Sequence, residues 1–248
     1  MRRNLFGLAA AVVSLVPPAL AHAEAPAQPP ASQTFVDRPS RANGSTAARI
    51  IAPTTARRRL SSVHRKRRID VQTSWSGQSQ KLLVLDSATH RGREWLKVLL
   101  PMRPNGSTGW ILRDRLALSR TRYWIDISTR ARKVTVYHRG KRVRQFRSVV
   151  GAPGTPTPHG LAAVYERNRQ PDPGGFLGPW ALSLTIMSNV LDNYGGGPGR
   201  VAIHGRAGAS LSDPLGSARS HGCIRVDNRH ISWLAARLPA GTPVKIRH

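Results

Sequence analysis

The stretch Ser220-His221-Gly222-Cys223-Ile224-Arg225 contains the only cysteine of the 248-residue chain. A histidine, His204, stands nineteen positions before this thiol (223 − 204). The thiolate is the nucleophilic form of cysteine, and a neighbouring imidazole that accepts the thiol proton makes the sulfur reactive. The stretch therefore indicates a Cys-His acyl-transfer site. The competing interpretation is that the single cysteine is a small buried apolar side chain.

The pattern around the thiol extends beyond one short motif. His204, the fifteen residues 205–219 and then Ser220-His221-Gly222-Cys223-x-Arg225 resemble the signature of the L,D-transpeptidase (YkuD-type) catalytic domain, whose members are cysteine enzymes that cross-link bacterial peptidoglycan. Segments 151–158, 178–182 and 195–205 are also similar to this family. The resemblance covers roughly the last half of the chain, in the family's order.

The resemblance implies a role for each residue of the motif. Cys223 would be the nucleophile and His204 the base that takes the thiol proton, with a backbone carbonyl near Gly205 orienting the imidazole. Backbone N–H groups of the turn at Ser220 to Cys223 would hold the oxyanion, and Gly222 would let the chain approach the substrate closely. We expect the Ser220 hydroxyl to stabilise the turn.

Two further side chains have expected roles near the thiol. Arg225 lies two residues after Cys223, so on a strand it shares that face and can present its guanidinium to a carboxylate of the substrate. His221 has several possible roles. It could form a structural hydrogen bond, contact the substrate, share in the proton transfer, or be the principal base in place of His204. These alternatives stay open at the level of sequence.

A metal site is the alternative use of the same side chains. His204, His221 and Cys223 could be zinc ligands, but no Cys-x-x-Cys pair or further ligand cluster stands beside them in the sequence. We therefore expect neither a metal nor another cofactor. Asp213, in the segment between the histidine and the cysteine, is expected to cap a loop and not to act as a catalytic acid.

The N-terminus predicts export to the cell wall or periplasm. Arg2 and Arg3 precede an apolar stretch over residues 5–16, and Ala21-His22-Ala23 forms a small-residue cleavage site, so residues 1–23 read as a signal peptide. General secretion and a twin-arginine route both fit these residues. A single cysteine cannot form an intramolecular disulfide, which leaves the thiol free for chemistry.

The formal net charge is +27, from 39 Lys and Arg against 12 Asp and Glu. Export argues against nucleic acid as the partner of this charge, and anionic wall polymers or a membrane surface are the expected counter-charges. Residues 24–68, rich in Ala, Pro, Ser, Thr and Arg, are predicted to be a disordered basic linker. The sequence does not indicate an oligomeric state.

The rest of the chain is predicted to be mainly β. Short alternating runs over residues 69–119 favour a small β-barrel that resembles bacterial SH3-like modules, with Trp95 and Trp110 either in its packing or in a ligand platform. Residues 120–248 are predicted to form the catalytic domain, a YkuD-like β-sandwich. One helix, after Asp227 and before Pro239, is expected to follow the catalytic strand.

The resemblance implies that Cys223 attacks a peptidoglycan tetrapeptide stem, releases its terminal D-alanine and transfers the acyl group to the side-chain amine of a neighbouring stem. This is a reaction of peptidoglycan biosynthesis and remodelling, hence of cell wall biogenesis and cell shape, and carbapenems are its implied covalent inhibitors. With water or a protein lysine as acceptor, the same site would act as an L,D-carboxypeptidase or attach proteins to the wall. A catalytically silent wall-binding protein is the alternative from another functional class.

Overall fold

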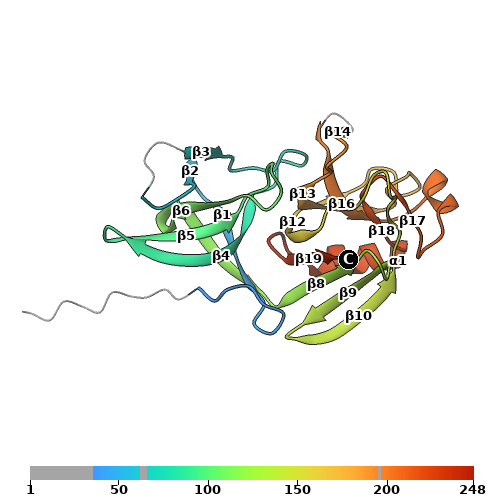
Figure 1. Ribbon diagram of the computed structural model, residues 1–248, viewed down its shortest axis with the longest axis horizontal. Helices are drawn as coiled ribbons and strands as arrows, with labels where there is room; N and C mark the ends of the chain where they lie inside the picture. Colours follow the sequence, from blue (N-terminus) through green and yellow to red (C-terminus); the bar gives the residue numbers. More distant parts are fainter. Residues whose placement is uncertain (1–35, 62–65, 195–196) are drawn as a thin grey trace, which may run out of the picture. The chain divides into compact units, whose positions relative to one another are not determined.

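Fifteen of the strands described here belong to two sheets. The computed structural model describes residues 36–61, 66–194 and 197–248 (Figure 1). The predicted signal peptide, 1–23, lies outside these residues. In the seven-stranded sheet the strand order is β3-β2-β6-β5-β4-β1-β7. Its strands are β1 (Ser45–Ile50), β2 (Thr54–Arg57), β3 (Lys66–Ile69), β4 (Lys81–His90), β5 (Arg93–Leu99), β6 (Thr108–Leu112) and β7 (Leu116–Thr121).

The eight-stranded sheet has the order β10-β9-β8-β19-β12-β13-β16-β18. Its strands are β8 (Tyr123–Ser128), β9 (Lys133–His138), β10 (Lys141–Arg147), β12 (Gly160–Arg169), β13 (Trp180–Met187), β16 (Arg200–His204), β18 (Ile224–Arg225) and β19 (Pro243–Arg247). Two small pairs join β11 (Val150–Gly151) to β17 (Ala218–Ser220), and β14 (Asn193–Tyr194) to β15 (Gly197–Pro198). Short 3₁₀ turns occupy η1 (Arg113–Arg115) and η2 (Gly208–Ser212). The mainly β class predicted from the sequence is confirmed.

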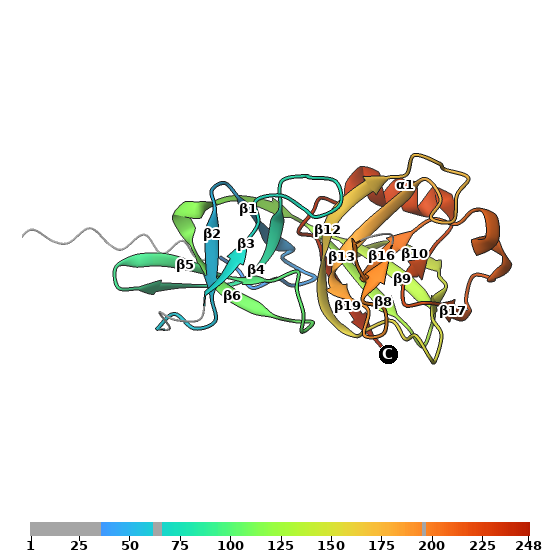
Figure 2. The ribbon, with the colours of Figure 1, turned by 90° about the horizontal axis from the view of Figure 1, so that it is seen from above.

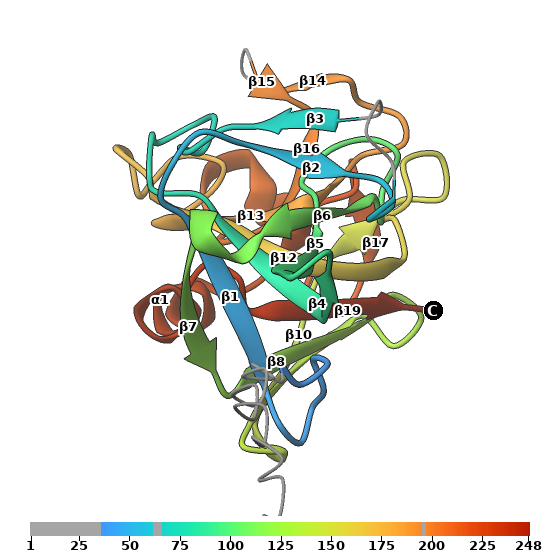
Figure 3. The same cartoon turned by 90° about the vertical axis from the view of Figure 1, so that its left-hand side faces the viewer.

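The predicted boundaries of the linker and of the small barrel differ from the structure. Strand β1 lies inside residues 24–68, the range assigned to a disordered linker, and it pairs with both β4 and β7 (Figure 3). Its side chains Ala47, Ala48 and Ile50 are buried. The composition argument failed because small side chains add little hydrophobicity, whereas a strand with neighbours on both sides satisfies its backbone groups fully. The first sheet thus begins at Ser45 and not at residue 69, and residues 24–35 and 62–65 lie outside the description.

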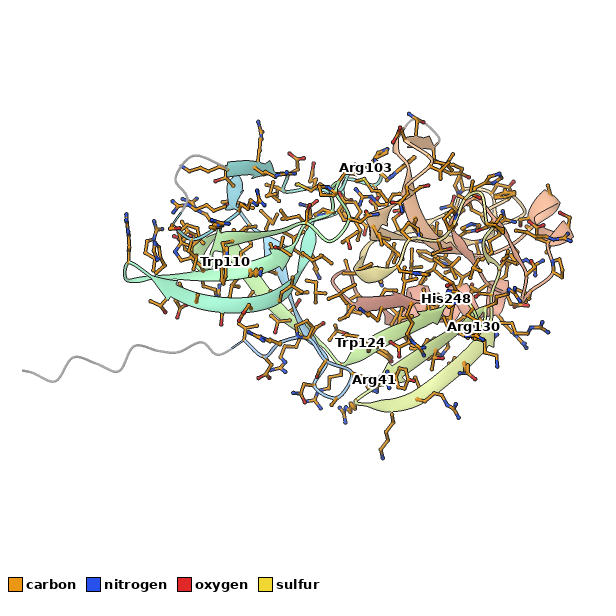
Figure 4. The ribbon with its side chains drawn as sticks, in the orientation of Figure 1. Arg41, Arg103, Trp110, Trp124, Arg130 and His248 are labelled. Atoms are coloured by element: carbon orange, nitrogen blue, oxygen red, sulfur yellow. The ribbon has the colours of Figure 1, made fainter. Side chains whose placement is uncertain are left out.

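One of the two tryptophans expected in the first sheet is a core residue. Trp95 is buried, and the Arg57 guanidinium lies 4.4 Å from the centre of its ring. Trp110, labelled in Figure 4, is half-buried on β6. For Trp95 the structure therefore selects packing over a ligand platform.

The helix has the position and the buried face that the sequence predicts. Helix α1 (Asn228–Arg237) begins after Asp227, whose carboxylate accepts a hydrogen bond from the Arg229 amide at 3.0 Å. Ile231 and Leu234 on one face are fully buried, and the helix packs against β13 and β16 (Figure 2). It is the one α-helix of the described residues, and none of them forms a helix long and apolar enough to cross a membrane.

Strands of the first sheet and the loops between them make direct contacts with β12, with β13 and with Ser188 directly after β13. The Asn105 side chain donates to the Met187 carbonyl and accepts from the Met187 amide, both at 2.8 Å. Arg103, labelled in Figure 4, donates to the carbonyl of Ser188 at 2.8 Å. Leu83 and Leu99 pack against Ala163 of β12 in a small apolar cluster, and Tyr165 accepts a hydrogen bond from the Ser74 amide. From residue 36 onward the described chain belongs to one compact unit.

Candidate active site

Two adjacent strand ends bring His204 and Cys223 to one place. Strands β16 and β18 are parallel neighbours, with Ile203 opposite Ile224 and both of these isoleucines fully buried in the core. His204 is the last residue of β16, and Cys223 directly precedes β18. Both side chains line the same cavity of about 50 Å³. Strand pairing and core packing therefore fix the imidazole and the thiol relative to each other.

The His204 ring has its orientation and tautomer set by the backbone. Its Nδ1 atom lies 2.8 Å from the carbonyl oxygen of Gly205, which can only accept a hydrogen bond, so Nδ1 carries the proton. Burial lowers the pKa of His204 to about 4; the hydrogen bond to Gly205 acts against this shift, and the charge of Arg225 adds to it. At neutral pH the ring is therefore uncharged and its Nε2 lone pair is available to accept a proton.

Opposing effects act on the pKa of the Cys223 thiol. The residue is partly exposed, and burial of its sulfur raises the pKa of the thiol. A backbone hydrogen bond from Ala202 and the positive charge of Arg225 act in the opposite direction. The resting groups are therefore a neutral thiol and a neutral imidazole that line one cavity, and the free Nε2 lone pair of this imidazole is of the kind that can accept a thiol proton.

The turn before the thiol is closed by the Ser220 hydroxyl. Ser220 Oγ donates to the Cys223 carbonyl at 2.6 Å and accepts from the Gly222 amide at 3.1 Å. Gly222 has a φ of +114°, which favours glycine. Its amide is thus already bonded, as is the Gly205 amide, which donates to the Trp180 carbonyl at 3.2 Å.

These bonds narrow the predicted set of oxyanion donors. Gly205 and Gly222 shape the backbone, while Ser220 stabilises the turn. Among the described residues, no hydrogen-bond partner is found for the amides of His221 and Cys223. These two N–H groups are the donors that the turn can offer to an oxyanion.

Two threonines that the sequence analysis did not single out hold this turn from the 151–158 segment. Thr155 Oγ1 donates to the Ser220 carbonyl, and Thr157 Oγ1 donates to the Gly222 carbonyl, each at 2.9 Å. The Thr157 hydroxyl also accepts from the Gly151 amide at 2.9 Å. This segment resembles the family pattern, and its threonines are the sequence feature from which their role in holding the turn could have been predicted.

Asn228 is a third residue whose role at the site was not predicted from the sequence. Its Oδ1 atom accepts from the Arg206 amide at 2.7 Å. A Cβ atom on Gly205 would lie 2.3 Å from the same oxygen, and one on Gly178 would lie 2.5 Å from it. The start of α1 therefore packs on the backbone that carries the carbonyl partner of His204, and this close approach requires glycine.

Arg225 lines the cavity that contains His204 and Cys223, and its guanidinium forms an ion pair with another residue of the protein. Its Nη1 atom lies 2.5 Å from the Asp213 carboxylate, and its guanidinium stacks over Phe176 at 4.8 Å from the ring centre. Asp213 was expected to cap a loop, and it is the residue that ends η2. Folding also places its carboxylate against a buried cation, a contact that the sequence did not predict. Binding of a substrate carboxylate by Arg225 stays a prediction.

His221 and Tyr194 complete the surroundings of the thiol. His221 is exposed and lines the same cavity as Cys223, so its alternative roles stay predictions. Tyr194, on β14, also lines this cavity. Its pKa is raised, mainly because it is partly buried and to a smaller extent because Cys223 is near. No group of three or more His, Cys, Asp or Glu side chains within the described ranges is placed to hold a metal ion.

This geometry defines a mainly β protein with a cysteine–histidine site at adjacent strand ends. Residues 122–246, about half of the chain, match the family model of the YkuD L,D-transpeptidase catalytic domain. The chain therefore belongs to the YkuD L,D-transpeptidase catalytic domain family.

Two curated relatives and two solved structures are similar to parts of this chain. The YkuD protein of Bacillus licheniformis is 37% identical over 124 residues, and that of Bacillus subtilis is 34% identical over 124 residues. Each match covers 50% of this chain and 65% of the relative's length. The L,D-transpeptidase of Mycobacterium smegmatis is 16% identical with a TM-score of 0.40, over 68% of this chain and 91% of that chain. The catalytic domain of the E. faecium L,D-transpeptidase is 23% identical with a TM-score of 0.35, over 50% and 95% of the two chains.

Proposed function

We propose that this protein is an exported L,D-transpeptidase that acts on the stem peptides of peptidoglycan. The observation that carries the proposal is the neutral His204 ring, oriented by the Gly205 carbonyl and lining the same cavity as the Cys223 thiol. This pair can generate a thiolate next to a bound carbonyl without a carboxylate as the third member of the catalytic set. Family membership supports the choice of substrate.

The first half-reaction forms a thioester. Nε2 of His204 takes the proton of Cys223 as the sulfur attacks the carbonyl carbon that precedes the terminal D-alanine of the donor stem. The amides of His221 and Cys223 donate to the resulting oxyanion. When the carbon–nitrogen bond breaks, His204 returns its proton to the leaving amine and D-alanine departs.

The second half-reaction passes the acyl group to an amine. The side-chain amine of a neighbouring stem attacks the thioester carbonyl, and His204 takes one proton from this amine. The carbon–sulfur bond then breaks, and the proton goes to the departing sulfur of Cys223. Water or a protein lysine as acceptor would give carboxypeptidase activity or protein attachment through the same thioester.

A role limited to wall binding has less support. The side chains that would serve only catalysis, Cys223 and His204, line one cavity, and hydrogen bonds to the Cys223 and Gly222 carbonyls hold the turn next to it. A binding module does not require a sulfur nucleophile. Within the proposal, the basic residues of the chain assist adhesion to anionic wall polymers or membrane headgroups, and the first sheet serves as the SH3-like wall-binding part.

The test is treatment of isolated sacculi with the pure protein, followed by mass analysis of the digested cross-links. We expect new stem-to-stem cross-links with the wild type and none with Cys223→Ala. A matched control, His90→Ala, changes a histidine of the hairpin β4–β5 and should act like the wild type. Release of D-alanine without new cross-links would assign the carboxypeptidase reaction instead. Activity in Cys223→Ala would contradict the proposal.

A further inference from the structure

Cys223 also lines a second and larger cavity, and this cavity is completed by residues outside the matched family region. Its volume is about 550 Å³, within the range of roughly 300–1,000 Å³ that small-ligand sites occupy. Trp75, Ser76 and Gln78 form part of its lining, although the family match begins at residue 122. We call this cavity the Trp75 cleft. The segment that precedes β4 thus reaches the same cavity as the nucleophile.

The floor of the Trp75 cleft is made of small side chains on two neighbouring strands. Ala181 and Ser183 alternate along β13 on one face, and Ala202 of β16 pairs with Ser183 in register. The residues between and beside them, Leu182 and Ile203, point to the opposite face and are fully buried in the core. The small side chains on the cleft face of the sheet therefore leave space for a ligand. The large side chains on the opposite face pack in the core and keep these strands rigid.

Hydrogen bonds to β12 fix the wall that carries Trp75. The Ser76 amide and hydroxyl donate to one carboxylate oxygen of Glu166, at 3.2 and 2.7 Å, and Glu166 is fully buried. The Gln78 side-chain amide donates to the Arg167 carbonyl at 2.9 Å. The Ser74 amide donates to the Tyr165 hydroxyl of β12 at 3.2 Å. Hydrogen bonds to β12 on both sides of Trp75 therefore hold its backbone at the cleft.

One face of the Trp75 ring packs against the backbone of β15, and the side chain remains open to solvent. A Cβ atom on Gly197 would lie 2.4 Å from the ring, so the indole packs directly on the backbone of β15. The residue is 40% exposed despite its size. Tyr194, on the partner strand β14, lines both the Trp75 cleft and the small catalytic cavity. An aromatic surface therefore leads from the wall of the cleft toward the thiol.

The charges at the cleft select the kind of ligand. Arg167 and Arg169 line it and both are exposed. The Arg167 guanidinium donates to the Ala235 carbonyl of α1 at 2.9 Å, whereas Arg169 forms no ion pair within the described residues. An elongated anionic peptide, with a carboxylate near the Arg169 guanidinium and its chain against an indole, matches this lining. A thioester at Cys223 would fix one end of such a peptide.

We propose that the Trp75 cleft binds the anionic peptide of the acyl donor on the side away from the leaving D-alanine, and that Trp75 is a specificity-determining residue which selects donors long enough to reach it. This inference rests on the proposed function for the identity of the peptide. It adds a role for the N-terminal sheet in substrate choice, beyond attachment to the wall.

The experiment compares Trp75→Ala with the wild type on two donors that differ only in length, a full tetrapeptide stem and a dipeptide of the diamino acid with D-alanine. For the tetrapeptide we expect KM to rise about tenfold, with kcat changed by less than about threefold. For the dipeptide we expect KM to stay at the wild-type value. Trp75→Phe should restore most of the tetrapeptide affinity, and Ile51→Ala, which removes an exposed apolar side chain directly after β1, should behave like the wild type.

A binding measurement separates this inference from the proposed function. In a Cys223→Ala background, calorimetry with the tetrapeptide should show a Kd about tenfold higher when Trp75 is also replaced by alanine. Wild-type protein that binds the tetrapeptide through Trp75 but never turns it over would overturn the proposed function alone. Equal KM values for Trp75→Ala and the wild type, or equal losses on both donors, would overturn the role of Trp75.

Discussion

The Arg225 guanidinium lies 2.5 Å from the Asp213 carboxylate, and only 4% of the Arg225 side chain and 20% of the Asp213 side chain are exposed. Asp213 comes from the segment after η2, whereas Arg225 is on β18, two residues after the nucleophile. The charge of Arg225 lowers the pKa values of both Cys223 and His204. The ion pair thus holds a fixed positive charge beside the two reactive groups.

Asp213→Ala should destabilise the protein by about 3 kcal/mol, because it leaves a buried guanidinium without its counter-charge. Denaturant unfolding of the wild type and the variant measures this difference. Asp192→Ala is the matched control, since the Asp192 side chain is 94% exposed in its pair with Arg103 and should contribute less than about 1 kcal/mol. Equal, small effects of the two substitutions would show that Asp213 does not compensate a buried charge.

The depressed pKa of His204 should make the folded state lose stability in acid. The unfolded ring titrates near 6.5 and the folded ring near 4, so the unfolded state binds more protons between these values. The contribution of the neutral ring is complete above pH 6.5 and declines as the pH falls toward 4. One pKa unit corresponds to about 1.4 kcal/mol, so the expected loss is at most about 3.5 kcal/mol. Unfolding curves of the wild type and His204→Gln between pH 4 and 7 should show a smaller acid dependence in the variant; parallel curves would contradict the assignment.

His204→Ala should slow acylation of Cys223 by about 10³-fold or more, because the thiol keeps its raised pKa and loses its proton acceptor. Stopped-flow mixing with a stem peptide measures the rate. His221→Ala is the informative comparison, since His221 is exposed and lines the same cavity. An inactive His221→Ala together with an active His204→Ala would move the role of base to His221.

A carbapenem should acylate the protein once, at Cys223. Its strained ring carbonyl would occupy the position of the stem carbonyl, within reach of the thiolate and of the His221 and Cys223 amides. Intact-mass measurement should show one adduct, and peptide mapping should place it on Cys223. Cys223→Ser should react far more slowly, because a hydroxyl is harder to deprotonate than a thiol. An adduct on Ser220 would mean that the nucleophile has been misassigned.

Ser76→Ala should lower stability by about 1–3 kcal/mol, because it removes a hydroxyl donor from a fully buried carboxylate. Thermal unfolding measures the effect. Ser212→Ala is the control: its hydroxyl donates to the Ala209 carbonyl at an exposed position and should matter little. No difference between the two variants would show that the bond to Glu166 is not needed to hold the segment around Trp75.

Much of the site could be read from the sequence because its parts are local. The turn from Ser220 to Cys223 is short, and its glycine with positive φ and its capping hydroxyl are properties of adjacent residues. The helix after Asp227 follows from an N-cap and an apolar periodicity within one segment. The carbonyl that orients His204 belongs to the next residue, Gly205, so its role could also be anticipated.

What the sequence by itself determined about this protein is the turn from Ser220 to Cys223, the helix after Asp227 and the mainly β class, because residues close together in the chain encode each of these; it also predicts Cys223 as the nucleophile and His204 as its base. Only the tertiary structure decided that Asp213 pairs with Arg225, that Ala47 and Ala48 lie in a central strand, and that Trp75 joins the cavity of Cys223. The physical reason is that such contacts depend on which strands become neighbours, and strand order is set by burial and backbone pairing summed over the whole chain.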